Sequence, residues 1–253
     1  TMYVGLGGAA ITSSVATSHD GGATWAPFGP LKGQFVWDLL PDPARPEVIY
    51  VALGQEGLFR SQDGGASWTL IAGKTPLHSI DALAASPDGV LYAGDLEANV
   101  GVYVSRDRGD TWLPLAGSPA RSVRLLRWLD DTLLVGTDQG LWQWAPDGWW
   151  TMLSAQPQRV YGAAGAHGIL FAGGGGGIFE LRAGAAPRKI AGDDVLNIDM
   201  LAGEKPVFVA SALDGAVLQW QLGDTQVRTI ARSADLGDPA YVFVVRGLPG
   251  PPL

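Results

Sequence analysis

The chain has 253 residues, of which 47% are apolar, and its formal net charge is −8. This negative charge opposes binding to a phosphate backbone or to an anionic lipid surface, so we expect no nucleic-acid partner. The sequence contains no cysteine, which excludes disulfides, thiolate metal sites and a cysteine nucleophile.

Metal and cofactor sites are not expected either. The three histidines, His19, His78 and His167, are far apart in the sequence, which argues against a histidine metal cluster. The longest nearly uncharged stretch, 162–179, is interrupted by one of these histidines and by five consecutive glycines. That pattern is typical of a strand and a loop, so we expect no membrane span.

Three similar segments occur in the first half of the chain. The sequence SHDGGATW at 18–25 returns as SQDGGASW at 61–68 and as SRDRGDTW at 105–112. We call these segments the octads. Their aspartates are 43 and 44 residues apart, which is the length of one four-stranded unit of a β-propeller. The spacing therefore predicts an all-β repeat protein.

Each octad is predicted to form a tight turn between two strands. The aspartate carboxylate can accept hydrogen bonds from backbone N–H groups of its own turn, and glycine tolerates the positive φ that such turns demand. The closing tryptophan brings roughly 150–250 Å² of surface to bury. The residues predicted to have this structural role are Ser18, Asp20, Gly22, Trp25, Ser61, Asp63, Gly65, Trp68, Ser105, Asp107, Gly109 and Trp112.

Apolar segments of strand length continue to recur after residue 120, although the octad sequence is no longer kept there. Six apolar strands are predicted, at 2–4, 48–51, 90–93, 132–135, 169–172 and 206–209. A further strand precedes each unit from the second onward, at 35–37, 79–81, 123–126, 159–161 and 195–198. No such strand precedes the first unit, and no unit follows the last predicted strand, 241–245. We therefore predict six four-stranded antiparallel blades, with the C-terminal strand joining the N-terminal blade to close the ring. Seven blades are the alternative if the termini were trimmed from a longer chain.

We expect residues 1–253 to form a single domain with a proline-rich tail at 248–253, which could begin a linker. The sequence opens inside a strand and shows no signal-like segment. Removal of an upstream signal would imply a location outside the cytoplasm, and the compartment is otherwise left open.

The octads resemble the Asp-box, or BNR, repeat of sialidase-like propellers, photosystem assembly factors and the sortilin receptor domain. The resemblance implies that each octad lies on the hairpin between the third and fourth strands of a blade, opposite the ligand-binding mouth. It also points to the non-catalytic branch, because the Arg-Ile-Pro motif of sialidase propellers is absent.

The opposite face is built partly by the connections that lead into the innermost strands. The residues predicted there as a binding mouth are Trp37, His78, Arg121, Arg159, Tyr161 and Asp194. Because they come from five successive innermost strands, we expect them to meet around a channel. The prediction is a rigid, monomeric module that binds a protein or a glycan without catalysis.

A glycoside hydrolase is the alternative from another class. A sialidase-like site would use Arg121, Arg124, Arg159 and Tyr161. A two-carboxylate site would draw on Glu56, Asp95, Asp138, Asp194 or Asp214, and the separation of its carboxylates decides the mechanism. The chain could also be one module of a larger enzyme or receptor.

Overall fold

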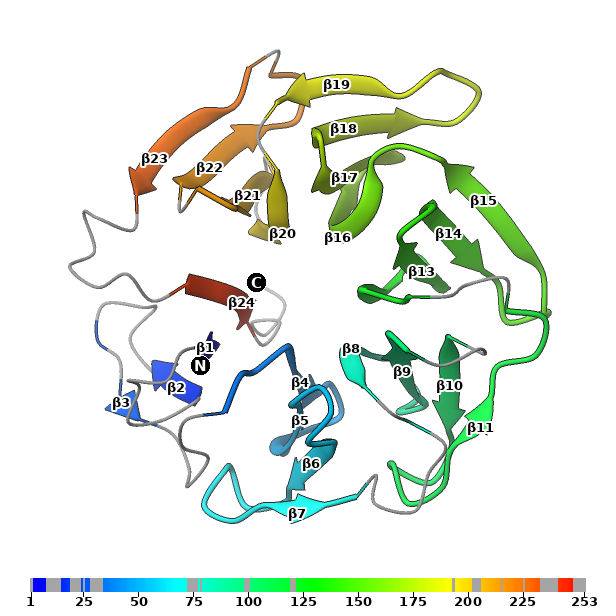
Figure 1. Cartoon of the computed structure of the whole chain (residues 1–253), viewed down its shortest axis with the longest axis vertical. Coiled ribbons are helices and arrows are strands. Elements are labelled where there is room, and N and C mark those ends of the chain that lie inside the picture. The colour runs from blue at the N-terminus through cyan, green and yellow to red at the C-terminus, as the bar shows by residue number, and fades with distance from the viewer. Residues whose placement is uncertain are drawn as a thin grey trace. The chain divides into compact units, whose positions relative to one another are not determined.

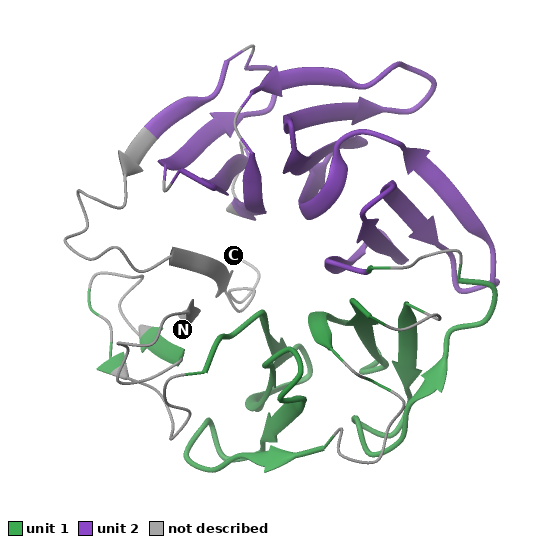
Figure 2. Ribbon diagram, in the orientation of Figure 1, with its two compact units in different colours: residues 1–122, 240–253 green, residues 123–239 purple. Residues whose placement is uncertain are grey.

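The structure is a computed structural model that describes residues 2–7, 15–18, 24, 26–27, 34–71, 77, 79–97, 101–118, 122–192, 194–201, 206–214, 216–224, 226–232 and 241–247. The chain divides into two compact units (Figure 2). Unit 1 comprises residues 1–122 and 240–253, and unit 2 comprises residues 123–239. Within the described residues there is no helix long and apolar enough to cross a membrane.

Unit 1 contains three four-stranded antiparallel sheets (Figure 1). One has the order β24-β1-β2-β3, with β1 at Met2–Gly7, β2 at Val15–Ser18, β3 at Ala26–Pro27 and β24 at Tyr241–Gly247. The next consists of β4 at Asp38–Asp42, β5 at Arg45–Ala52, β6 at Leu58–Ser61 and β7 at Thr69–Leu70. The third consists of β8 at Ile80–Ala85, β9 at Leu91–Asp95, β10 at Val102–Ser105 and β11 at Leu113–Pro114.

Unit 2 also contains three such sheets, and each is built from consecutive strands. The first consists of β12 at Leu125–Leu129, β13 at Thr132–Thr137, β14 at Gly140–Trp144 and β15 at Trp150–Ser154. The second consists of β16 at Gln158–Ala166, β17 at Ile169–Gly175, β18 at Gly177–Arg182 and β19 at Arg188–Ala191. The third consists of β20 at Val195–Leu201, β21 at Val207–Ala212, β22 at Ala216–Gln221 and β23 at Arg228–Arg232.

The expectation of six blades, or of seven, is wrong. Five blades are continuous in the chain, each made of four consecutive strands between β4 and β23. The remaining sheet is a composite of both chain ends, in which β24 pairs with β1 in the antiparallel sense, as the orphan last strand predicts. We therefore count five blades and one composite sheet, because only the five arise by repetition of one uninterrupted stretch of chain.

Aromatic side chains of the second strands, together with one from the third strand β22, are buried between the blades. Tyr50 on β5 and Tyr92 on β9 are buried in unit 1. In unit 2, Phe171 on β17, Phe208 on β21 and Trp220 on β22 are buried together, with ring centroids 4.6 to 5.5 Å apart. Each aromatic ring buries a large apolar area, so these clusters dominate the cores.

A buried carboxylate joins the first two blades of unit 1. Asp38 on β4 is only 5% exposed, and it accepts hydrogen bonds from the N–H groups of Leu39 and Leu83, both at 2.8 Å. Leu83 lies on β8 of the next blade. A buried charge needs partners of this kind, so Asp38 fixes the position of β8 against β4.

Candidate functional site

The described part of the predicted mouth lies mainly in unit 2. Arg159 and Tyr161 are on β16, and Asp194 immediately precedes β20, which contacts β16. Trp37 lies in unit 1 ahead of β4 rather than on a strand at 35–37, and its N–H donates to the carbonyl of Ala52 at 3.0 Å. His78 and Arg121 lie outside the described residues. The structure thus brings three of the six predicted residues to two neighbouring strands.

Two β-bulges set the directions of Arg159 and Tyr161. In the β16–β17 register, Gln158 faces Gly175, Val160 faces Gly174 and Gly162 faces Gly173. Arg159 and Tyr161 have no opposite residue on β17, so each is the extra residue of a bulge. A bulge re-aims its side chain and disrupts the local ladder, and bulges are common beside functional sites.

Glycines allow the neighbouring backbones to come close to these bulges. A Cβ atom at Gly174 would lie 2.4 Å from the carbonyl oxygen of Arg159. A Cβ atom at Gly162 would lie 2.2 Å from the backbone nitrogen of Ile198 on β20. These distances exclude any larger residue without backbone movement. The close approach of chain segments therefore explains Gly162, Gly173, Gly174 and Gly177, whereas Gly176 has a φ of +91° and open space around it.

An ion pair at the end of the preceding blade supports the bulges. Arg124 Nε donates to Asp138 Oδ1 at 2.7 Å, and Arg124 Cζ lies 5.3 Å from the ring centroid of Tyr161. This placement allows a cation–π interaction. The N–H of Arg159, which has a φ of +54°, donates to the carbonyl of Asp138 at 3.4 Å. A positive φ is uncommon for a residue other than glycine.

Arg124 and Asp138 belong to the predicted hydrolase sites and not to the predicted mouth. Arg124 directly precedes β12, and Asp138 directly follows β13. Since β12 and β13 are antiparallel neighbours, the start of one and the end of the other lie at the same end of the sheet. The pairing of Arg124 with Asp138 could therefore have been predicted from the two flanking strands, if these were assumed to form a hairpin.

Asp194 connects β20 to the neighbouring turns. Its Oδ1 accepts a hydrogen bond from the N–H of Gly176 at 2.7 Å, and its carbonyl accepts one from the N–H of Leu213 at 2.7 Å. The Leu213 side chain is 53% exposed. We define the unit 2 rim as the residues Arg124, Asp138, Arg159, Tyr161, Asp194 and Leu213. The rim combines charges of both signs with an aromatic ring and an exposed leucine.

Four of the five carboxylates considered for hydrolysis have partners within the chain. Asp95 accepts hydrogen bonds from the N–H groups of Ser79 at 3.4 Å and Glu97 at 2.9 Å. Asp214 accepts one from the N–H of Ala216 at 3.0 Å, and Asp138 and Asp194 have the partners given above. Stabilisation of loops accounts for these four groups. Among the described residues, no cluster of three or more His, Asp or Glu side chains could hold a metal ion.

The second octad forms a loop closed by its own side chains. Asp63 accepts hydrogen bonds from the Ser61 hydroxyl at 2.8 Å, the Ser67 N–H at 2.9 Å and the Ser67 hydroxyl at 2.6 Å. The Trp68 indole N–H donates to the carbonyl of Gly65 at 3.1 Å. The hydrogen bonds from Ser67, followed by that from Ser61, lower the pKa of Asp63 from 3.8 to about 2.

The third octad repeats this network. Asp107 accepts hydrogen bonds from the Ser105 hydroxyl at 2.8 Å and from the Thr111 N–H at 2.8 Å, and the Trp112 indole donates to Gly109 at 3.1 Å. The hydrogen bonds from Thr111 lower the pKa of Asp107. In the first octad, Ser18 ends β2, whereas Asp20, Gly22 and Trp25 lie outside the described residues.

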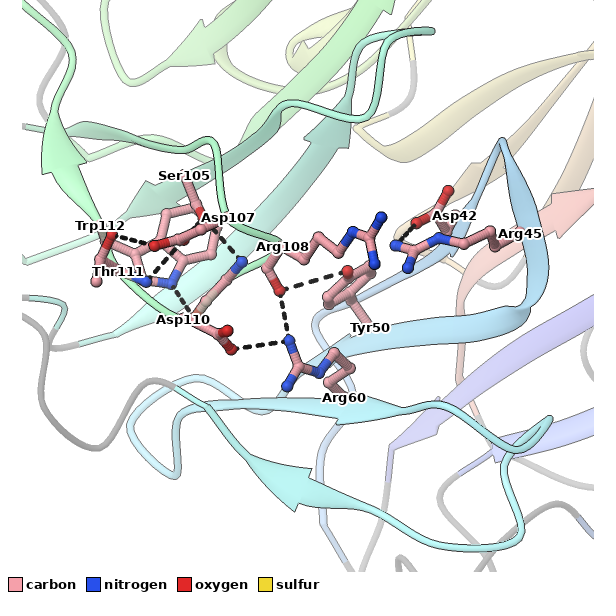
Figure 3. A network of polar contacts seen from close by, with 11 residues as sticks. Asp42, Arg45, Tyr50, Arg60, Ser105, Asp107, Arg108, Asp110, Thr111 and Trp112 are labelled. Carbon is pink, nitrogen blue, oxygen red and sulfur yellow. Dashed lines mark hydrogen bonds and ion pairs between the residues drawn. The ribbon is translucent and has the colours of Figure 1, made fainter.

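The third octad also contacts the preceding blade (Figure 3). Arg60 on β6 donates from Nη1 to the carbonyl of Arg108 at 2.8 Å and to Asp110 Oδ1 at 2.9 Å. The Tyr50 hydroxyl donates to the same carbonyl at 3.4 Å. Burial raises the pKa of Tyr50, so the phenol stays a neutral donor. Within unit 1, the octad therefore fastens the β8–β11 blade to the β4–β7 blade.

Comparison with known proteins bears on the fold. No protein-family profile matches the chain, and no curated protein matches it. A chain of a nidogen/laminin complex matches with a TM-score of 0.73 at 12% identity, over 93% of this chain and 95% of that chain. The WD40 β-propeller domain of Doa1 matches with a TM-score of 0.61 at 14% identity, over 79% of this chain and 71% of that chain. The fold is a β-propeller.

A third solved structure has the same fold. YCF48 from Cyanidioschyzon merolae matches this propeller with a TM-score of 0.56 at 15% identity, over 81% of this chain and 75% of that chain. At such low identities the likeness concerns the fold, because one fold hosts many unrelated functions.

Proposed function

We propose that this propeller is a rigid, non-catalytic module that binds an extended segment of another protein at the unit 2 rim. The observation that carries the proposal is the pair of bulges at Arg159 and Tyr161. They project one cationic and one aromatic side chain from positions on either side of Val160, in a strand that is otherwise held in a regular ladder. Side chains placed on rigid strands are suited to recognition without rearrangement.

The chemistry of the rim favours a peptide that carries a carboxylate. Arg159 is exposed, and the described residues show no ion pair to its guanidinium. A guanidinium in this state can bind a carboxylate through two parallel hydrogen bonds. Tyr161 and the exposed Leu213 add apolar surface, and aromatic and arginine side chains are enriched at the centres of protein interfaces.

The comparisons support a protein ligand more than a sugar. The similar structures include a nidogen/laminin complex and a YCF48 bound to a D1 peptide, which are binding events of those proteins. The octads support the finer proposal that the chain is an Asp-box propeller, because two of them form the same closed loop. The partners found for four candidate carboxylates favour binding over a two-carboxylate hydrolase.

Selection of peptides tests the proposal. We would select random twelve-residue peptides displayed on phage against the purified chain and measure the affinity of the enriched peptides by isothermal titration calorimetry. Enriched peptides are expected to carry Asp or Glu and to bind Arg159→Ala roughly ten-fold or more weakly, because a hydrogen bond to a charged group contributes about 1.5–3 kcal/mol.

Arg228→Ala is the matched control, because Arg228 is an exposed arginine on the outer strand β23, away from the rim. The control variant is expected to bind the peptides as the unaltered chain does. Equal losses in the two variants, or no loss in either, would show that the rim is not the binding site. Enrichment of no peptide together with binding to a glycan array would favour the sugar ligand instead.

A further inference from the structure

The third octad departs from the other two at its fourth position. The first and second octads have glycine there, Gly21 and Gly64, whereas the third has Arg108. Gly64 has a φ of +67° and Arg108 a φ of +65°, so the backbone has the same left-handed conformation with either residue. This conformation costs energy for a residue that carries a Cβ atom, and residues held in it cluster at ligand sites. The turn itself therefore does not account for the arginine.

The side chain of Arg108 has no role within the described part of the chain. It is exposed, and its guanidinium makes no hydrogen bond or ion pair to a described residue. Only the backbone carbonyl of Arg108 is used, by Tyr50 and Arg60. Any residue at this position would supply that carbonyl. The guanidinium is thus available to a partner from outside the chain.

Two further arginines lie near this guanidinium. Figure 3 shows the Arg108 side chain pointing from the octad toward Tyr50 and Arg45, and Arg60 contacts the Arg108 carbonyl. Burial raises the pKa of Tyr50, and the charge of Asp42 adds to this effect. The positive charges of Arg45, Arg60 and Arg108 all act on the same hydroxyl in the opposite direction. We call these three residues, from β5, β6 and the third octad, the arginine cluster.

The arginine cluster keeps donor groups that the chain itself does not use. Arg45 donates from Nη2 to Asp42 Oδ2 at 2.5 Å. Arg60 donates from Nη1 to the Arg108 carbonyl and to Asp110. The other terminal nitrogens of the three guanidinium groups have no hydrogen-bond partner among the described residues. Guanidinium groups bind carboxylate and phosphate groups through several parallel hydrogen bonds.

The number of arginines decides which anion fits. A carboxylate has two oxygen atoms in one plane, which a single guanidinium can match. A phosphate or sulfate group has oxygen atoms that point in several directions, so it can accept hydrogen bonds from guanidinium groups of different chain segments. We propose that the arginine cluster binds a phosphate or sulfate group, with Arg108 as its principal ligand. The cluster belongs to unit 1 and shares no residue with the unit 2 rim, so this proposal does not depend on peptide binding there.

A titration followed by nuclear magnetic resonance tests the site. Sodium sulfate and sodium phosphate would be added to the ¹⁵N-labelled full chain, with sodium chloride adjusted to hold the ionic strength constant, because salt screens charges without binding. The Arg108 amide and the arginine Nε–H signals are expected to shift and saturate with both ions. Sodium acetate should bind more weakly. Shifts that do not saturate, or acetate binding as tight as that of sulfate, would overturn the proposal.

Arg108→Gly separates binding from folding. The glycine is expected to weaken sulfate binding at least about ten-fold, because it removes the hydrogen bonds of one guanidinium. Its thermal midpoint should not fall, since Gly64 has the same backbone conformation in the second octad. Arg108→Lys keeps the charge but not the planar donor set, and its affinity should lie between the two.

Arg228→Ala is the control for net charge, because it removes an exposed arginine of β23 in unit 2. It should bind sulfate as the unaltered chain does. An equal loss in Arg108→Gly and Arg228→Ala would mean that only the total charge matters, and would refute a site at the cluster.

Asp110→Asn gives a prediction of the opposite sign. The Asp110 carboxylate competes with the ligand for Arg60, and exposed ion pairs of this kind are weak, so the substitution should tighten sulfate binding about two- to five-fold. Unchanged or weaker binding would show that Arg60 does not belong to the site. Phosphoserine and glucose 6-sulfate distinguish the two sources of the group. At least one should displace inorganic sulfate, and the stronger competitor identifies the source, whereas displacement by neither contradicts the proposal.

Discussion

Gly162 shows how strongly one residue can constrain the packing of two blades. A Cβ atom there would lie 2.2 Å from the backbone nitrogen of Ile198, and backbone cannot turn aside as a flexible side chain can. Gly162→Ala is therefore expected to destabilise the chain by about 2–3 kcal/mol. Urea unfolding followed by tryptophan fluorescence would measure the change.

Gly192→Ala is the control for that substitution. A Cβ atom at Gly192 would meet no other atom within 4 Å, and the residue needs no positive φ. The alanine should leave the stability unchanged or raise it slightly, because alanine reduces the conformational freedom of the unfolded chain. A similar loss in both variants would show that β16 and β20 are not packed closely at Gly162.

The carboxylate of Asp63 gives a pH dependence with a definite sign. Its pKa in the folded chain is about 2, against an ordinary value of 3.8, mainly because of the hydrogen bonds from Ser67. A lowered pKa means that the contribution to stability is present above the unfolded value and is lost as the pH falls through the folded value. The wild-type chain should therefore lose stability between about pH 4 and pH 2 more steeply than Asp63→Asn.

Urea midpoints measured from pH 2 to pH 5 would check this prediction. Asp131→Asn is the matched control, because Asp131 is an exposed aspartate in the turn between β12 and β13. The control should follow the wild-type profile. An Asp63→Asn profile parallel to that of the wild type would show that the octad carboxylate does not contribute through its charge.

At the scale of elements, Arg60 makes two contacts with the octad loop between β10 and β11, and these contacts are expected to differ in strength. The Arg60 side chain is only 14% exposed, and the Arg108 carbonyl that it contacts also accepts from the Tyr50 hydroxyl, whereas the Asp110 side chain is 63% exposed and its ion pair is open to solvent. We expect Arg60→Ala to destabilise unit 1 by about 1–3 kcal/mol, because it removes both contacts. Asp110→Ala should cost less than about 1 kcal/mol, as exposed ion pairs usually do.

Urea midpoints of these two variants would measure the loss of stability, and hydrogen exchange would measure its local effect on the octad loop. The amide of Thr111, which donates to Asp107, should exchange faster in Arg60→Ala than in Asp110→Ala. Equal destabilisation by both substitutions would contradict the view that the carbonyl of Arg108 is the main attachment point.

The strands were predictable where apolar runs and turns repeat, and the bulges were not. Segments such as 169–172 and 206–209 lie largely inside β17 and β21, because a buried second strand needs a nearly continuous apolar sequence. The bulges of β16 depend on the approach of backbone from β17 and β20, which no local pattern encodes. For this reason Arg159 and Tyr161 could be predicted as site residues from the sequence, whereas the bulges that project their side chains from the ladder could not be predicted.

The contacts among the side chains of the unit 2 rim could not be predicted for a related reason. Arg124 and Asp138 are 14 residues apart, and Arg124 meets Tyr161 from another blade. Charges in loops are ordinarily solvated, so only the folded arrangement distinguishes a paired charge from a free one.

For the molecule as a whole, repetition explains five blades, and the composite sheet requires both ends of the chain. The pairing of β24 with β1 has a consequence for the order of events during synthesis. Met2 faces Gly247 in this ladder, so the two partners are separated by almost the entire chain. Each of the five blades can assemble from neighbouring hairpins as it leaves the ribosome, but β1 must wait for β24 to be translated. Contacts of such long sequence separation form slowly. Until then, the N-terminal strand is an open edge, and a nascent chain that stalls before residue 241 would be exposed to aggregation and proteolysis at that point.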